Sequence, residues 1–78
     1  MSKKLPITSG RKALKAFYKM GFKFASQKGS HVTIKKGNVG CTIPLHPELD
    51  KGTLNGILKQ ANVDRKEFLK YLIILLKD

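Results

Sequence analysis

The sequence predicts an α+β fold, an α-β-β-β-α sandwich in which helices cover one face of a three-stranded antiparallel sheet. Apolar residues follow a helical period before residue 21 and again after residue 50. Between these segments, residues 22–45 alternate between apolar and polar side chains, and two glycine-containing turns interrupt the alternation. The helices are expected to cover the apolar side of the strands, because the sequence supplies no second sheet.

The first helix is expected to begin after Thr8 or Ser9, since either side chain can cap a helix N-terminus. Gly21 is its expected end, because glycine readily adopts the left-handed conformation that follows many helices. Helical spacing gives this helix an apolar side made of Ala13, Leu14, Phe17 and Met20.

Three strands are expected over residues 22–24, 31–35 and 39–45, with turns at residues 27–30 and 36–38. Side chains alternate along a strand, so one face of the sheet is predicted to be apolar and covered by helices. That face consists of Phe22, Phe24, Val32, Ile34, Val39, Cys41, Ile43 and Leu45. The other face is predicted to be positive and exposed to solvent, and it carries Lys23, His31, Thr33, Lys35 and Thr42.

Two more helices are expected in the C-terminal part of the chain. Asp50 caps the first of them, whose apolar residues are Leu54, Ile57, Leu58 and Ala61. Asp64 and Glu67 have the spacing of a capping box and begin an additional C-terminal helix that extends to Lys77. Its apolar residues include Phe68, Leu72 and Leu75.

The size of the chain predicts a single domain over residues 1–78, with a core at about 7–61 and the C-terminal helix at about 64–77. Cys41 is the only cysteine, which is typical of proteins in a reducing cytoplasm. The first six residues lack the apolar run of a signal peptide. The longest apolar run, residues 71–76, is far shorter than a membrane span. We therefore expect a cytoplasmic protein without a membrane partner.

Positive charge is concentrated in the first half of the chain. Residues 1–47 contain ten Lys or Arg and no Asp or Glu, so they carry +10 of the net charge of +11. Such a field indicates a polyanionic partner, either nucleic acid or an acidic protein. An ordinary lysine-rich surface is the alternative, but it would be expected to spread its charge more evenly.

Gly29-Ser30-His31 places an imidazole at the start of a strand, beside a tight turn, on the basic face. Histidine exchanges protons near neutral pH, so His31 is the candidate general base for attack of a ribose 2′-hydroxyl on the adjacent phosphorus. Lys28 and Lys35 are the candidate groups to stabilise the extra negative charge on that phosphorus. Gly29 allows the RNA backbone to approach, and Ser30 can hold a phosphate oxygen. The candidate RNA-binding residues are Lys23, Lys28, Gly29, Ser30, Thr33, Lys35 and Lys36.

A metal mechanism is not expected, because no carboxylate precedes Glu48 and the two histidines and Cys41 lie on different segments. We expect Cys41 to be a small core residue. His46 has two interpretations. It is either a second catalytic group, acting as the general acid, or a residue with a structural or RNA-contact role. Gly52-Thr53 can likewise bind phosphate or simply begin a helix.

Several motifs follow one another in a fixed order between about Ile7 and Ala61. They are Gly29-Ser30-His31, Pro44-Leu45-His46-Pro47, Lys51-Gly52-Thr53-Leu54 and Ile57-Leu58-Lys59-Gln60-Ala61. This order resembles the HicA toxin family of type II toxin–antitoxin modules. The resemblance implies a fold like a double-stranded RNA-binding domain, with His31 as the catalytic residue. It further implies metal-independent mRNA cleavage that needs no cofactor, and neutralisation by a HicB-like antitoxin.

The chain departs from the commonest family pattern by continuing into the helix at about 64–77, whose segment 71–76 is apolar nearly all round. Part of this segment is expected to close the core, and the rest is available as an interface with the antitoxin or with a second copy. Two other functions stay open at this point. One is a non-catalytic RNA-binding module that uses the same basic face, and the other is a protein-interaction or DNA-binding subunit.

Overall fold

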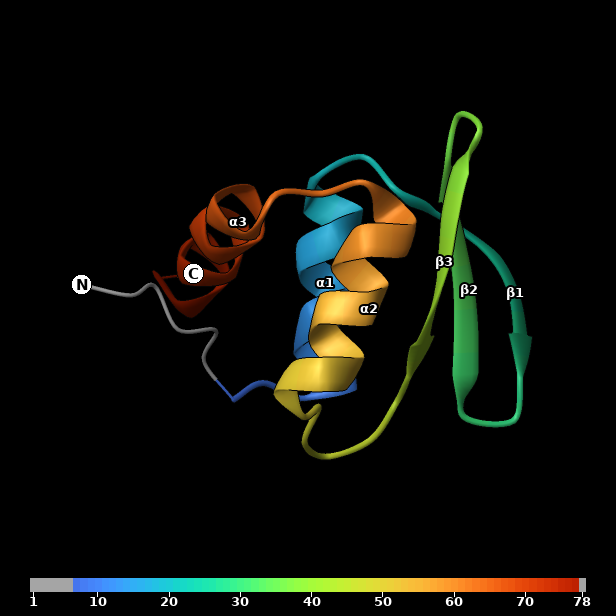
Figure 1. Ribbon diagram of the computed structural model, residues 1–78, viewed down its shortest axis with the longest axis horizontal. Coiled ribbons are helices and arrows are strands. Elements are labelled where there is room, and N and C mark those ends of the chain that lie inside the picture. The colour runs from blue at the N-terminus through green and yellow to red at the C-terminus, as the bar shows by residue number, and fades with distance from the viewer. Residues whose placement is uncertain (1–6, 78) are drawn as a thin grey trace.

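The computed structural model describes residues 7–77, and its element order α-β-β-β-α-α is the predicted one (Figure 1). The expectation that residues 1–6 lack a signal peptide concerns residues that lie outside the described ones. The elements are α1 (Gly10–Lys19), β1 (Lys23–Lys28), β2 (His31–Lys36), β3 (Val39–Pro44), α2 (Lys51–Ala61) and α3 (Arg65–Lys77). The first strand was predicted over residues 22–24, but β1 continues to Lys28. The turn predicted at residues 27–30 is therefore shorter.

The three strands form one antiparallel sheet in the order β1-β2-β3. The helices α1 and α2 lie side by side between this sheet and α3 (Figure 1). Both α1 and α2 pack on β3, and α3 packs on α1. The helices therefore leave the opposite face of the sheet uncovered, as the sequence predicts.

Side-chain hydrogen bonds confirm the predicted caps of α1 and α2. The Ser9 side chain caps α1 by accepting a hydrogen bond of 3.1 Å from the Lys12 N–H. Gly21 follows that helix with a φ of +103°, a conformation that other residues rarely adopt. The Asp50 side chain caps α2 by accepting a hydrogen bond of 2.7 Å from the Thr53 N–H. That hydrogen bond, made by the Thr53 backbone N–H, is the main reason why the pKa of Asp50 is lowered.

Aromatic rings connect the layers of the core. The ring centroids of Phe17 and Phe22 are 5.1 Å apart, and those of Phe17 and Phe68 are 5.6 Å apart. Phe68 therefore places α3 in the same core as α1 and the sheet. The sheet contributes the side chains predicted for the inner faces of β2 and β3, and the buried ones are Val32, Ile34, Cys41 and Ile43.

Phe24 corrects one prediction. The sequence places Phe22 and Phe24 together under the helices, but Phe22 is 5% exposed and Phe24 is 57% exposed. Phe24 pairs with the buried Ile34 and so faces the helix side, but α1 and α2 pack on β3, at the other edge of the sheet. A bulge between Phe24 and Ser26 then shifts the register of β1. An edge strand beyond the reach of the helices cannot bury its apolar residue.

The C-terminal helix presents two different sides. Phe68 and Leu72 are buried in the core, whereas Ile73 and Ile74 are 51% and 37% exposed. The first backbone hydrogen bond of α3 runs from the Phe68 N–H to the Asp64 carbonyl, which confirms the predicted start. Among the described residues, none of the helices has the length and apolar character needed to cross a membrane.

Candidate active site

The Gly29-Ser30 turn places His31 on the open face of the sheet. Lys28 and His31 are paired across β1 and β2, so only Gly29 and Ser30 connect the two strands. Gly29 has a φ of +60°, which fits the first central position of a type II′ hairpin turn. The Gln27 side chain steadies this turn by donating a hydrogen bond of 3.0 Å to the Gly29 carbonyl. His31 is exposed, as the alternation of β2 predicts.

His46 lies beside His31, although the sequence alone did not fix its position. The centroids of the two imidazole rings are 6.3 Å apart, and their planes are inclined by 78°. Two backbone hydrogen bonds hold the loop in place. The Leu45 N–H donates to the Ser30 carbonyl at 2.7 Å, and the Gly10 N–H donates to the His46 carbonyl at 2.9 Å. These hydrogen bonds therefore join three segments around the two histidines, namely the hairpin turn, the end of β3 and the start of α1.

The lysines predicted to surround His31 are not equally close to it. Lys28 is the direct partner of His31 across the hairpin, and paired Cα atoms lie only about 4.5–5.5 Å apart. Lys35 lies four residues along β2, which corresponds to about 13 Å. Lys35 instead pairs with Lys23 at the far end of the hairpin. Of the two lysines predicted to stabilise charge beside His31, only Lys28 is its neighbour.

Lys36 lies apart from the other predicted RNA-binding residues. Its ammonium donates a hydrogen bond of 2.7 Å to the Met20 carbonyl at the end of α1. The same ammonium lies 5.9 Å from the centroid of the Phe22 ring. Lys36 thus contacts residues at the end of α1, and it lies at the opposite end of β2 from His31.

Thr33 lies at the centre of the open face, between the two ends of the hairpin. Its hydroxyl is 3.1 Å from the hydroxyl of Thr42 on β3, and either oxygen can be the donor. Ser26 is the partner of Thr33 on β1. The open face therefore has a hydroxyl-bearing centre, with basic residues at both ends of the hairpin.

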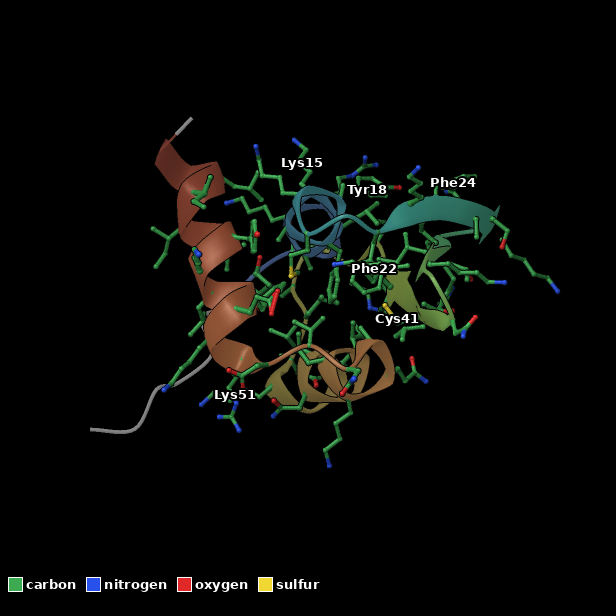
Figure 2. All side chains as sticks on the ribbon, turned by 90° about the horizontal axis from the view of Figure 1, so that it is seen from above. Lys15, Tyr18, Phe22, Phe24, Cys41 and Lys51 are labelled. Atoms are coloured by element: carbon green, nitrogen blue, oxygen red, sulfur yellow. The ribbon has the colours of Figure 1, made fainter. Side chains whose placement is uncertain are left out.

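A groove runs along the rim of the sheet, on the helix side of the same hairpin. Its volume is about 360 Å³, and three of its lining residues, Lys15, Tyr18 and Phe24, follow one another along one side of the molecule in Figure 2. The residues that line it are Arg11, Leu14, Lys15, Tyr18, Phe24, Gln27, Val32 and Leu45. This groove was not predicted, although its four residues from α1 have the spacing of one helix face, a pattern that is visible in the sequence.

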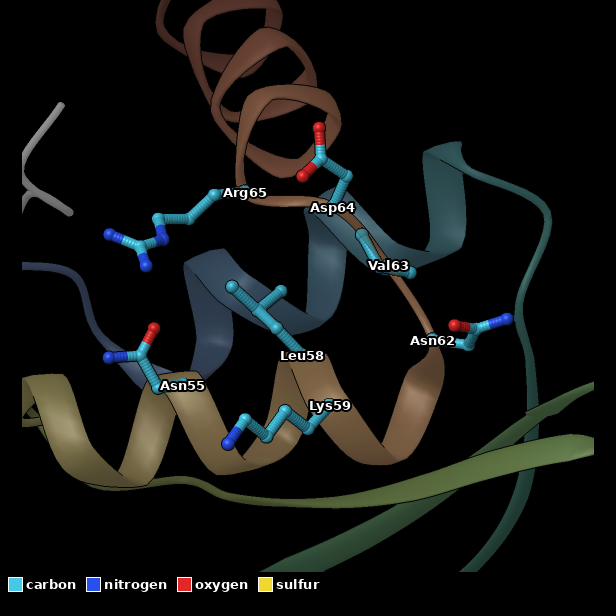
Figure 3. A pocket seen from close by; sticks show the side chains of 7 residues that line it. All are labelled: Asn55, Leu58, Lys59, Asn62, Val63, Asp64 and Arg65. Atoms are coloured by element: carbon cyan, nitrogen blue, oxygen red, sulfur yellow. The ribbon is translucent and has the colours of Figure 1, made fainter.

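A larger hollow of about 640 Å³ lies between the end of α2 and the start of α3 (Figure 3). Its lining residues are Asn55, Leu58, Lys59, Asn62, Val63, Asp64 and Arg65. This set contains neither histidine nor cysteine, and none of its members belongs to the hairpin or to the His46 loop. The size of the hollow therefore does not make it the reactive site.

Two further predictions concern the burial of Cys41 and the presence of metal ligands. Cys41 is buried, and burial raises the pKa of its thiol to about 11, so it is the core residue that the sequence predicts. Within residues 7–77, no three His, Cys, Asp or Glu side chains gather as ligands for a metal ion would. Gly52-Thr53 forms the first turn of α2, where the Thr53 N–H is taken by Asp50.

Comparison with known protein families shows the family to which this chain belongs. A family model described as the HicA toxin of bacterial toxin–antitoxin systems matches residues 10–63, more than half of the chain. The chain belongs to the HicA toxin family. Membership in this family implies an antitoxin partner. The curated proteins contain no significant match. The matched segment ends before Arg65, so α3 lies outside the part that the family model covers.

Proposed function

We propose that this HicA-family protein is an endoribonuclease that cleaves mRNA in the cytoplasm without a metal ion. The observation that carries the proposal is the exposed His31 on the open basic face, directly across the hairpin from Lys28. A general base in this position is accessible to a ribose hydroxyl. The neighbouring ammonium is close enough to hold the phosphate beside that hydroxyl.

The reaction follows from these groups. His31 accepts the proton of a 2′-hydroxyl, and the oxygen forms a bond to the adjacent phosphorus. The bond from phosphorus to the 5′-oxygen then breaks, which leaves a 2′,3′-cyclic phosphate and a free 5′-hydroxyl. Lys28 stabilises the extra negative charge that develops on the phosphate oxygens. Removal of a general base typically costs about 10²–10⁴-fold in rate.

The direct test is to incubate the purified protein with RNA in EDTA, with His31→Ala as the variant. We expect wild type to produce the cyclic phosphate ends, and His31→Ala to lose cleavage while it retains RNA affinity. If wild type binds RNA but leaves it intact, the protein is a non-catalytic RNA-binding module. Equal binding of DNA of the same length would instead favour a DNA-binding subunit.

Two lysines on the same strand pair give a matched comparison. Lys28→Ala and Lys35→Ala each remove one positive charge from the open face, so each is expected to reduce the salt dependence of binding to single-stranded RNA. The slope of log K against log salt changes by about 0.7 for each phosphate contact. Only Lys28→Ala is expected to lower the cleavage rate of bound RNA, because only Lys28 is the neighbour of His31.

We assign the groove beside Tyr18 and Phe24 to unpaired RNA bases. Both rings are partly exposed, at 38% and 57%, and Arg11 and Lys15 line the same groove. Stacking of a base on an aromatic side chain is worth about 1–3 kcal/mol. Phe24→Ala is expected to weaken binding of single-stranded RNA by an amount in this range, and an unchanged dissociation constant would remove the groove from the RNA-binding surface.

We propose a HicB-like protein as the antitoxin, and assign to α3 a role in assembly with that antitoxin or with a second copy. The exposed side of α3 carries Ile73 and Ile74, which line a shallow apolar hollow on this helix together with Leu69 and the lysines Lys66 and Lys70. The molecular mass of the protein alone and with its antitoxin distinguishes the two assemblies. Ile73→Glu is expected to disrupt whichever assembly uses α3, and an unaffected mass in both cases would exclude this surface.

A further inference from the structure

The reaction proposed above needs a second proton transfer. When the bond to the 5′-oxygen breaks, that oxygen leaves as an alkoxide unless another group gives it a proton. His31 has just accepted a proton from the attacking side, and the attacking and leaving oxygens lie on opposite sides of the phosphorus. A separate general acid near the leaving oxygen therefore accelerates the reaction.

We propose that His46 is this general acid, an inference that rests on the proposed ribonuclease activity. The centroids of the His31 and His46 rings are 6.3 Å apart, and both side chains are exposed. Proton transfer requires each ring nitrogen to lie about 2.6–3.2 Å from its oxygen, so the ring centroids are about two such distances apart and leave room between them for the oxygens of one phosphodiester. One phosphodiester can therefore contact both rings at once.

The fold fixes this pair of rings although they come from different elements. His31 begins β2, and His46 lies in the loop that follows β3. The hydrogen bond between Leu45 and Ser30 joins that loop to the hairpin turn, and the hydrogen bond between Gly10 and the His46 carbonyl joins it to α1. Both bonds use backbone atoms, so they position the His46 side chain without occupying its ring.

Other groups near His31 are less suited to this role. Lys28 is paired with His31, but an ammonium gives up its proton far less readily than an imidazolium near neutral pH. The hydroxyl of Thr33 already contacts that of Thr42. Lys28 thus stabilises charge, His31 accepts the proton of the 2′-hydroxyl, and His46 gives a proton to the 5′-oxygen. The two histidines end the step with their protonation states exchanged.

The test compares two RNA substrates that differ only in the leaving atom. In the second substrate a sulfur replaces the bridging 5′-oxygen at the cleavage site. A thiolate needs no proton in order to leave, because thiols ionise at a pKa of about 8.5. Single-turnover cleavage is measured in EDTA for wild type, His31→Ala and His46→Ala. Glu48→Gln, which changes an exposed residue of the same loop, controls for disturbance of the loop.

We expect His46→Ala to cleave the oxygen substrate about 10²–10⁴-fold more slowly than wild type. With the sulfur substrate, His46→Ala is expected to approach the wild-type rate, whereas His31→Ala stays inactive because the base is still needed. Circular dichroism and RNA affinity are expected to stay unchanged in His46→Ala, since its backbone hydrogen bond to Gly10 remains.

Three results would overturn the assignment. The first is a His46→Ala variant that cleaves the oxygen substrate at the wild-type rate, and the second is one that is equally slow on both substrates. The third is a loss of cleavage fully explained by weaker RNA binding, which would make His46 a contact residue. In each case wild type still cleaves, so the proposed function survives. If wild type cleaves neither substrate, the proposed function and this inference both fail.

Discussion

Gly10→Ala offers a sharp test of how α1 meets the His46 loop. Alanine is normally the better helix residue, by up to about 1 kcal/mol over glycine. At Gly10, however, a Cβ atom would lie 2.8 Å from the Leu45 Cα and 2.9 Å from the Pro44 carbonyl carbon, and nearer still to the carbonyl oxygen. All three atoms are backbone, so no flexible side chain can move aside.

The expected cost follows from these contacts. Forcing an extra carbon into a packed site typically costs about 1–3 kcal/mol. Displacement of the loop also weakens the 2.9 Å hydrogen bond from the Gly10 N–H to the His46 carbonyl, worth about 0.5–1.5 kcal/mol. For a domain of this size, each 1 kcal/mol lowers the Tm by about 4–8 °C. We therefore expect Gly10→Ala to lower the Tm measured by circular dichroism, and to slow RNA cleavage.

Gly56→Ala provides the matched control. Gly56 lies inside α2, and an added Cβ would meet nothing within 4 Å. Here only helix propensity acts, so the free energy of unfolding is expected to rise by about 0.4–1 kcal/mol. If Gly10→Ala also raises the Tm, or leaves it unchanged, the close contact between α1 and the loop is refuted.

Three further substitutions or conditions test other parts of the structure. Phe68→Ala is expected to lower the free energy of unfolding in urea by about 3–5 kcal/mol, because the ring is fully buried against Phe17, whereas Ile73→Ala on the exposed side of α3 is expected to change it by less than about 0.5 kcal/mol. The Cys41 thiol, whose pKa burial raises to about 11, is expected to react with a thiol reagent at pH 8 only after unfolding, so rapid labelling of the native protein would contradict its burial. Asp50 has a lowered pKa in the folded state, so its contribution to stability is complete above its unfolded pKa and is lost as the pH falls through the folded one. Unfolding of wild type at pH 7 and pH 3 is expected to show a larger loss of stability than Asp50→Asn shows, since asparagine also caps helices but does not titrate.

Local signals were sufficient to predict most of the fold. Ser9 and Asp50 cap helices because short polar side chains satisfy free N–H groups, and that chemistry acts within three residues. The alternation in β2 and β3 likewise predicts the buried side correctly, because the inward side chains of both strands reach the core.

The sequence could not predict features that depend on how distant elements pack. The exposure of Phe24 depends on which edge of the sheet the helices cover. The separation of Lys28 from Lys35 depends on strand register, which pairs the first with His31 and the second with Lys23. His46 is near His31 because backbone hydrogen bonds join the loop after β3 to the hairpin turn and to α1. His31 itself was predicted on the correct face, since β2 keeps a regular alternation.

The bulge in β1 has a consequence for the behaviour of the chain at high concentration. Within the described residues, β1 forms one edge of the sheet and directs backbone polar groups outward. A flat edge of this kind invites strands of other molecules to add to it, which leads to aggregation. The irregular register near Ser26, with Lys23 and Lys28 at the two ends of the strand, opposes such growth. The bulge thus hinders strand addition at the β1 edge, while the adjacent sheet face stays open to solvent.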